Sequence, residues 1–263
     1  MMDIIVTTGQ KTTLEQVVKA QEVAKTLHAV FVSRENFSIA TLRKSCKVET
    51  ILVVSKRGLV VHTLEGELFF HLNMAQLRIK NLRMGKIDNM VQAMGLQEGM
   101  SVLDCTLGLA ADSIVASYIA GEKGRIVGLE VSPILALIAK LGLKQYQTNE
   151  PELQNALRRI EVVQEDYNMY LLQLPKNSFD VVYIDPMFRR PIHESVNLQP
   201  MRCLADHRAV SLESLTEARR VAKKCVVVKE TNHSSEFERL QIETIFGGKY
   251  SSVNYGVIDA SKS

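Results

Sequence analysis

"GMSVLDCTLGLAADSIVASYIAGEKGRIVGLE", residues 99–130, contains the pattern that decides the fold of this chain. Apolar and β-branched residues predict a buried strand in "MSVLDCT", a helix in "DSIVASYIAG" and a second strand in "GRIVGLEV". Two strands joined by a helix lie parallel in one sheet, because a parallel pair needs a crossover connection. The stretch therefore predicts a strand–helix–strand unit of a parallel sheet.

The same alternation continues along the chain as far as residue 230. The next predicted elements are a helix in "PILALIAKLGLKQY", strands in "RIEVVQED" and "FDVVYIDP", a helix in "SLESLTEARRVAKK" and a strand in "CVVVKE". Parallel strands that alternate with helices form a sheet with helices on both faces. We therefore expect an α/β fold with a Rossmann-like, doubly wound and mostly parallel sheet.

The residues before this sheet have patterns of their own. "TTLEQVVKAQEVAKTL" predicts a helix with Thr13 as its cap. Its expected apolar stripe consists of Leu14, Val17, Val18, Ala24 and Leu27. "ETILVVSKRGLVVHTLEGELFFHL" predicts short strands joined by hairpins at Arg57-Gly58 and Glu65-Gly66. These elements predict a small α/β module.

Composition indicates a globular chain of one large domain with a small companion. It has 263 residues, of which 46% are hydrophobic and 23% are charged, so it can bury a large core. We divide it into a small N-terminal α/β module (1–72), a basic helical connector (73–98) and a large domain (99–263). The net charge of +3 excludes a chain that binds nucleic acid as a global polycation.

Cysteine spacing and hydropathy exclude further classes. Cys46, Cys105, Cys203 and Cys225 form no C-x-x-C pair, so neither a zinc knuckle nor a disulfide framework is predicted. The apolar stretches are shorter than the roughly 18 residues that a membrane-spanning helix needs. The N-terminus has no signal-peptide pattern. We expect a cytoplasmic protein that does not enter a membrane.

Polar residues follow the first predicted strand of the large domain. "VLDCTLGLAADS" contains Asp104, Thr106 and Gly108 before a helix that opens near Asp112. A glycine here lets the backbone approach a ligand closely, and the first turn of a helix offers free N–H groups. The spacing is neither the G-x-G-x-x-G dinucleotide motif nor a phosphate-binding P-loop. A plain connection between a strand and a helix is the alternative.

Acidic residues stand at the ends of the following strands as well. Glu130 ends "RIVGLE", Glu165 and Asp166 end "RIEVVQED", and Asp185 ends "FDVVYID". Ligands of open parallel sheets bind beyond the carboxyl ends of the strands, so these side chains are expected to meet. Repeated carboxylates argue against a ligand rich in phosphate. They suit a ligand with a ribose, an adenine and a positive centre, and S-adenosylmethionine is such a ligand.

The motifs resemble those of class I S-adenosylmethionine-dependent methyltransferases over roughly residues 99–230. "LDCTLGLAADS", "VGLE" and "FDVVYIDPMF" together look like the bacterial 16S rRNA guanine-N-methyltransferase family, which has a D-x-T-x-G-x-x-x-D turn and a D-P-M-F strand end. "MAQLRIKNLRMGK" and "PMRCLA" are also similar to that family, whereas the first seventy residues are not. The resemblance implies a methyltransferase that acts on a guanine amine of ribosomal RNA.

The resemblance also implies which residues hold the cofactor. Its expected cofactor-binding residues are Asp104, Thr106, Gly108, Asp112, Glu130, Asp166 and Asp185. The glycine turn would lie under the methionine part, with Glu130 on the ribose hydroxyls and Asp166 beside the adenine amine. Ala110 stands where the family usually has a second glycine.

Asp185-Pro186-Met187-Phe188 looks like a variant of the Asp/Asn-Pro-Pro-Tyr/Phe turn of amino-methyltransferases. The resemblance implies that Asp185 accepts a hydrogen bond from the target amine, that Pro186 offers a carbonyl acceptor and that Phe188 stacks on the base. These three residues are the expected catalytic group, and no metal or catalytic histidine is predicted. A strand that simply stops at Asp-Pro is the alternative.

Basic residues suggest where RNA would bind. The expected RNA-binding residues are Arg78, Arg83, Lys86, Arg189 and Arg202. The alternative for the first three of them is a helix face that contacts only solvent. A methyltransferase for a small molecule or a protein, and a catalytically inactive RNA-associated protein that still binds the cofactor, are the competing functions. Ribosomal RNA or the small ribosomal subunit is the expected partner.

Overall fold

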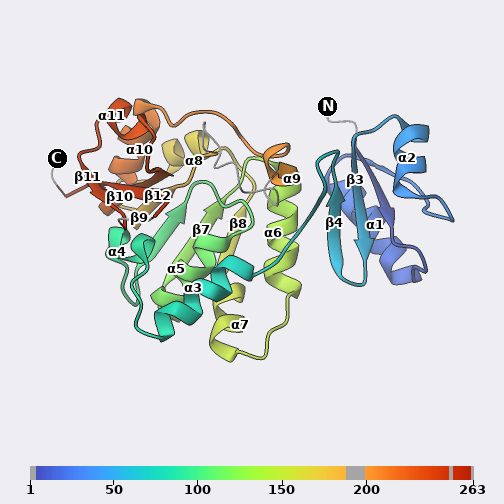
Figure 1. The fold of residues 1–263 in the computed structure, drawn as a ribbon, viewed down its shortest axis with the longest axis horizontal. Helices are drawn as coiled ribbons and strands as arrows, with labels where there is room; N and C mark the ends of the chain where they lie inside the picture. Colours follow the sequence, from blue (N-terminus) through green and yellow to red (C-terminus); the bar gives the residue numbers. More distant parts are fainter. Residues whose placement is uncertain (1–3, 188–198, 249–250, 262–263) are drawn as a thin grey trace.

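The computed structural model describes residues 4–187, 199–248 and 251–261. Within these residues the strands form two sheets, an N-terminal one and a larger one (Figure 1). The N-terminal sheet contains β1 (Ile4–Thr8), β2 (Val30–Phe31), β3 (Thr50–Ser55), β4 (Gly58–His62) and β5 (Glu67–Phe69), in the order β2-β1-β3-β4-β5. Its first three strands are parallel, and β4 and β5 are antiparallel additions. The predicted hairpins are therefore present.

Helices α1 (Leu14–Thr26) and α2 (Ile39–Cys46) belong to this N-terminal unit. Thr13 caps α1 as expected, because its hydroxyl accepts a hydrogen bond from the backbone N–H of Gln16. The expected apolar stripe is wrong in part, since Leu14 and Val18 are 80% and 47% exposed. The helix instead packs through small residues, with Ala20 and Ala24 in contact with the sheet beside Val23.

The larger sheet contains β6 (Ser101–Asp104), β7 (Arg125–Leu129), β8 (Ile160–Val163), β9 (Phe179–Ile184), β10 (Ala222–Thr231), β11 (Thr244–Phe246) and β12 (Val253–Asp259). Their order is β11-β12-β10-β9-β6-β7-β8, and every neighbouring pair from β8 to β10 is parallel. The chain moves from β6 through β7 to β8 and then crosses back to β9 on the other side of β6. This reversal opens a crevice at the carboxyl ends of β6 and β9.

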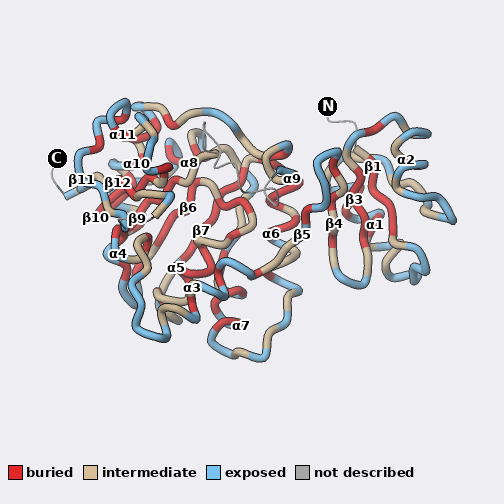
Figure 2. Tube along the Cα trace, in the orientation of Figure 1, coloured by how far each residue is buried: buried red, intermediate tan, exposed pale blue. Residues whose placement is uncertain are grey.

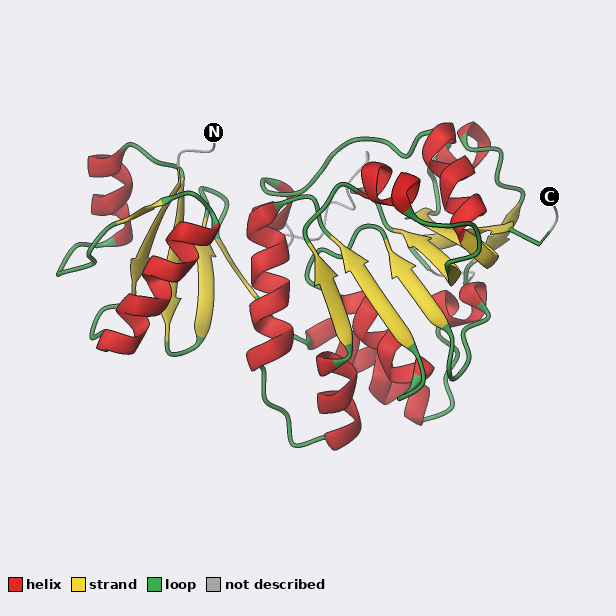
Figure 3. Ribbon diagram, turned by 180° about the vertical axis from the view of Figure 1, so that it is seen from behind, coloured by secondary structure: helices red, strands yellow, loops and turns green. Residues whose placement is uncertain are grey.

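Helices cover both faces of the larger sheet (Figure 3). They are α3 (Asn73–Arg83), α4 (Asn89–Met94), α5 (Ala111–Ala120), α6 (Pro133–Gln145), α7 (Pro151–Arg158), α8 (Tyr167–Gln173), α9 (Gln199–Arg202), α10 (Leu212–Val221) and α11 (Glu236–Arg239). One face packs α3, α4, α5 and α7, and the opposite face packs α8, α10 and α11. Val181 lies on the first face and Val182 on the second, as the period of two in a strand requires.

Figure 2 shows that the buried residues are concentrated in the strands and on the inner sides of the helices. The predicted helix over 211–224 ends at Val221, because Ala222–Lys224 already belong to β10. Ala75 and Ile79 of α3 lie in the same core as β6 and β9. Residues 73–98 are therefore packed on the larger sheet, and the three-part division of the chain stays a prediction.

Helix α6 joins the two units. Ile134, Leu135 and Ile138 on its outer side share one core with β1, β3 and β4 of the N-terminal sheet. At the other end of the helix, Gly142 lies directly against Phe70, and a Cβ on that glycine would be 2.0 Å from Cγ of the ring. The N-terminal sheet is thus fixed to the helix that follows β7. No helix within the described residues is long and apolar enough to cross a membrane.

We expect Gly142→Ala to destabilise the protein, because the new methyl group cannot fit against Phe70 without backbone movement. Overpacking costs about 1–3 kcal/mol, more than the gain of about 1 kcal/mol from replacing a glycine within a helix. Thermal melting should show the loss. The double variant Gly142→Ala with Phe70→Ala should lose less stability than the sum of its single changes, and strict additivity would contradict this packing.

Candidate active site

A cavity of about 530 Å³ lies at the carboxyl ends of the parallel strands. Its size is within the range of about 300–1,000 Å³ that is usual for small-molecule sites. Asp104 of β6, Glu130 after β7, Asp185 after β9 and Lys229 of β10 all line it. The cavity therefore occupies the place where the strand order reverses, and it brings together the acidic strand ends of three non-adjacent segments.

The glycine turn after β6 is held by Asp104. One carboxylate oxygen accepts a hydrogen bond from the backbone N–H of Thr106 at 3.0 Å, and the other accepts one from the Ser113 hydroxyl at 2.6 Å. Burial raises the pKa of Asp104 to about 7, although both hydrogen bonds oppose this shift. Gly108 adopts a φ of +53°, which a side chain would disfavour. The predicted turn is present, with Thr106 and Gly108 on the cavity wall.

Glu130 connects this turn to the next strand. Its carboxylate accepts hydrogen bonds from the backbone N–H groups of Gly108 and Ser132, both at 2.9 Å. The residue is buried, and burial raises its pKa. A carboxylate has about four acceptor positions, so Glu130 can still accept a hydrogen bond from a ligand hydroxyl group. The geometry suits the predicted contact with a ribose, and that contact stays a prediction.

Ala110 stands at the cap of α5 with a φ of 65°, in the left-handed region that glycine favours. The family glycine at this position is thus replaced by the smallest residue that has a side chain, and the backbone keeps the conformation that glycine would adopt. Ala110 is fully buried. The departure from the family pattern leaves the shape of the turn intact.

Asp185, Pro186 and Met187 line the cavity at the end of β9. The backbone N–H of Asp185 donates a hydrogen bond to the Thr106 hydroxyl at 2.6 Å, which ties this strand end to the glycine turn. The side chain accepts a hydrogen bond from Lys229 at 2.8 Å. Phe188 lies outside the described residues, and the catalytic roles of Asp185, Pro186 and Phe188 stay predictions.

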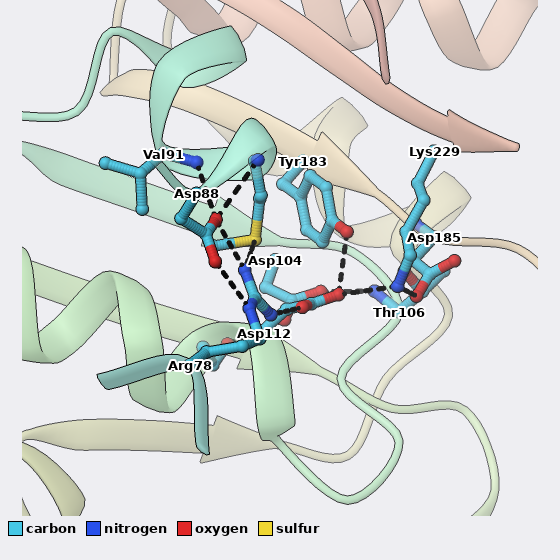
Figure 4. Close-up of polar contacts among 11 residues, drawn as sticks. Arg78, Asp88, Val91, Asp104, Thr106, Asp112, Tyr183, Asp185 and Lys229 are labelled. Atoms are coloured by element: carbon cyan, nitrogen blue, oxygen red, sulfur yellow. Dashed lines mark hydrogen bonds and ion pairs between the residues drawn. The ribbon is translucent and has the colours of Figure 1, made fainter. Parts of the chain in front are cut away.

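Five charged side chains form a continuous chain of contacts, and we call them the charge ladder: Asp88, Arg78, Asp112, Lys229 and Asp185 (Figure 4). All of them except Asp88 line the cavity. Acidic and basic groups alternate along it. Arg78 binds Asp88 through two hydrogen bonds of 2.7 and 2.9 Å and also pairs with Asp112. Lys229 contacts Asp112 at 3.1 Å as well as Asp185. The ladder joins α3, α5, β9 and β10.

The ladder sets the charge states of its members. Burial would raise the pKa of Asp112, but Lys229 and Arg78 outweigh it and hold that pKa well below the usual range. Burial likewise opposes the charge of Lys229, yet Asp112 and Asp185 raise its pKa. Asp185 differs, because burial dominates over the attraction of Lys229 and raises its pKa to about 6. Asp185 is therefore the carboxylate of this group whose charge changes nearest to neutral pH.

Asp166 does not have the expected position. Its carboxylate caps α8 by accepting a hydrogen bond from the backbone N–H of Asn168 at 2.9 Å. It also forms an ion pair with Arg208 at 2.8 Å. Glu165 and Tyr167 line the cavity at this strand end, whereas Asp166 does not. The sequence does not show which of Glu165 and Asp166 lines the cavity and which caps the helix, because capping depends on where the strand ends. The contact of Asp166 with adenine stays a prediction that this geometry does not favour.

The predicted RNA-binding residues do not gather at one place. Arg78 and Arg202 line the cavity, but Arg78 is held by the charge ladder. Arg83 and Lys86 do not line it; Arg83 pairs with Glu150 and donates a hydrogen bond to the hydroxyl of Tyr118. Arg189 lies outside the described residues. Arg83 and Lys86 are therefore not on the cavity wall, and RNA contact by the predicted residues stays a prediction.

Three residues at this site were not predicted from the sequence: Lys229, Tyr183 and Tyr255. Tyr183 donates a hydrogen bond from its hydroxyl to Asp112 at 2.7 Å, and Tyr255 lines the cavity beside Lys229. A signal for Lys229 was available, because "CVVVKE" is a parallel strand that ends in two charged residues like the strands before it. No comparable signal exists for Tyr255, which comes from an antiparallel strand near the C-terminus.

The charges fit the predicted cofactor. With the two basic and three acidic groups of the ladder ionised, it carries one net negative charge, and Asp104 and Glu130 add carboxyl groups to the same cavity. Such a surface attracts a cationic ligand and repels one that carries several phosphates. The described residues contain no group of three His, Cys, Asp or Glu side chains that could hold a metal ion.

Comparison with known proteins agrees with this chemistry. A family model described as "Putative SAM-dependent methyltransferase" matches residues 36–252. The chain belongs to this family. The protein is therefore an S-adenosylmethionine-dependent methyltransferase, and its larger sheet has the Rossmann-like class I fold that the sequence predicted.

Three relatives show how far the similarity extends. The protein YpiP of Bacillus subtilis, whose name says it is uncharacterized, is 37% identical over 98% of this methyltransferase and 100% of its own length. A Ribosomal RNA small subunit methyltransferase J of Coxiella burnetii is 32% identical over 64% of this chain and 65% of its own. A crystal structure of a SAM-dependent methyltransferase from Neisseria gonorrhoeae matches with a TM-score of 0.66 and 18% identity, covering 98% and 97% of the two chains. This last likeness shows the fold.

We expect Glu130→Gln to weaken S-adenosylmethionine binding by about 1.5–3 kcal/mol, the usual range for hydrogen bonds to a charged group. The reason is that an amide keeps the shape of the side chain but loses its charge and half of its acceptors. Isothermal titration calorimetry measures the change. Glu161→Gln is the matched control, because Glu161 is an exposed acid on the neighbouring strand β8. Equal affinity of both variants would contradict the role of Glu130.

Proposed function

We propose that this methyltransferase modifies the exocyclic amine of a guanine in small-subunit ribosomal RNA. The observation that carries the proposal is the Asp185-Pro186-Met187 turn, which places a carboxylate on the wall of the cofactor cavity. An exocyclic amine is a hydrogen-bond donor, so a carboxylate acceptor at this place suits it better than a carbonyl substrate. The names of the relatives that act on small-subunit ribosomal RNA support the substrate class.

The residues of this chain contribute mainly by orientation. When bound, S-adenosylmethionine supplies a methyl group that is already activated on its sulfonium. Asp185 accepts a hydrogen bond from one N–H of the amine and thereby directs the nitrogen lone pair. Proper alignment of two reactants contributes up to about 7–11 kcal/mol, so no strong acid or base is needed. The N–C bond forms as the methyl C–S bond breaks, and the amine then releases one proton to Asp185 or water. Asp185 is the stronger hydrogen-bond acceptor while it is ionised, and burial raises its pKa to about 6. Activity should therefore decline below that pH.

Local basic residues support an RNA partner despite the small net charge. Arg202 lines the cavity, and Lys86 is exposed on the loop after α3. Phosphate contacts by such side chains position RNA without reading its sequence. The guanine itself would be recognised inside the cavity. A cytoplasmic location stays the prediction that the sequence made.

We expect ribosomal RNA from cells that lack this gene to lose one methylated guanosine, and mass spectrometry of RNA nucleosides to detect the loss. A plasmid copy should restore the nucleoside, whereas a copy with Asp185→Ala should not. Asp185 is the end member of the charge ladder, and Lys229 keeps Asp112 as its partner, so this variant should still fold, which thermal melting of the purified protein checks. An unchanged nucleoside profile together with methylation of a metabolite or a protein would overturn the RNA assignment.

We expect RNA binding to weaken with salt, and Arg202→Ala to reduce the slope of log K against log salt by about 0.7–0.9 for one lost phosphate contact. Arg83→Ala is the informative comparison, because that arginine points to Glu150 rather than into the cavity. Fluorescence anisotropy with a small-subunit RNA fragment gives both slopes. A slope that changes only for Arg83→Ala would move the RNA surface to α3.

A further inference from the structure

Lys229 has an unusual position for a lysine. Its side chain is 18% exposed and lies between the carboxylates of Asp112 and Asp185, at 3.1 and 2.8 Å. Figure 4 shows its ammonium group at the junction of these two acids, with Asp185 beyond it. A buried lysine at the end of a parallel strand has lost most of its hydration, so its charge depends on the two partners.

We propose that Lys229 is a positioning residue for methyl transfer, which holds the Asp185 carboxylate ionised and correctly turned so that it can accept a hydrogen bond from the substrate amine. The proposal rests on the proposed function, since it assigns Asp185 to the amine. It differs from a purely structural role, because the ion pair determines the charge state of the group that faces the substrate.

Charged and titratable groups from every surrounding element act on Asp185. Asp112 of α5 and Asp104 of β6 are acidic, and each disfavours a second negative charge nearby. The hydroxyl groups of Tyr183 on β9 and Tyr255 on β12 stay protonated, because burial raises the pKa of both. Arg78 of α3 is engaged with Asp88 and Asp112. Among these described groups, Lys229 is the cation in direct contact with Asp185.

Lys229 is not suited to act as a base itself. Burial opposes its charge, but Asp112 and Asp185 together raise the pKa of the ammonium above its usual value. A lysine that stays protonated can donate hydrogen bonds and attract carboxylates, but it cannot accept a proton from the amine. Its effect on the reaction therefore passes through Asp185.

Removal of the lysine charge should shift the titration of Asp185. An opposite charge at this distance lowers the pKa of a carboxyl group by about 1–3 units, so Lys229→Met should raise the midpoint of Asp185 by about that amount. The single-turnover rate at pH 7 should then fall by roughly 2- to 100-fold, since a midpoint near 6 moves to about 7–9. The rate should recover toward the parent value as the pH is raised.

The experiment measures two titrations on the full-length protein. The first is the pH dependence of single-turnover methylation of small-subunit RNA. The second is the ¹³C carboxyl shift of Asp185 by nuclear magnetic resonance, in protein without RNA, with the signal assigned by its loss in Asp185→Asn. Lys229→Arg should keep both midpoints near the parent values. Lys224→Met is the matched control, because it removes an exposed lysine from the same strand.

Equal midpoints for Asp185 in the parent protein and Lys229→Met would overturn the proposal. Loss of rate at all pH values with an unmoved midpoint would also overturn it and leave Lys229 as a structural residue. If Lys229→Met melts at a lower temperature than the parent protein, the measurements are made on Lys229→Gln instead, because its amide still donates to both acids. The carboxyl titration needs no substrate, so failure of the RNA assignment alone would leave its result valid.

Discussion

The alternating contacts of the charge ladder are the constraint on which the active site depends. Three carboxylates and two cations are buried together, and each interior member is stable only because oppositely charged neighbours stand on both sides. Removing one partner of a buried pair typically costs about 3–5 kcal/mol, since the other charge is left uncompensated. The ladder therefore fixes α3, α5, β9 and β10 relative to one another at the point where the cavity forms.

The ladder also explains why residues 73–98 belong to the active site. Helix α3 buries Ala75 and Ile79 against the larger sheet, and this packing directs Arg78 toward Asp112. Asp88 then anchors the far side of Arg78 and at the same time caps α4 through the backbone N–H of Val91. A helix that the sequence marks as basic thus uses one of its arginines inside the protein. Arg83 of the same helix is exposed and instead contacts Tyr118 of α5 and Glu150.

Much of the fold follows from the sequence because its causes are local. Strand and helix periods in "GMSVLDCTLGLAADS" and "FDVVYID" predict a parallel sheet, and carboxylates at strand ends predict a site for a cationic ligand. The ion-pair partners of the charged side chains do not follow from local sequence, because they depend on packing between distant segments. Nothing near Arg78 in the sequence predicts a contact with Asp112 or Asp88. The choice between Glu165 and Asp166 depends on a helix cap, and Lys229 gains its role only when β10 lies beside β9.

Both units of the chain contribute residues to the wall of the cavity. Strand ends of the larger sheet supply Glu130 and Asp185, and Leu68 and His71 from the N-terminal part of the chain also line the cavity. Leu68 lies in β5 and His71 follows that strand, on either side of Phe70 in the sequence, and the Phe70 ring packs on Gly142 of α6. The position of this wall is therefore set by the N-terminal sheet. The N-terminal sheet therefore contributes to the cavity wall through β5 and to the fold through its packing on α6.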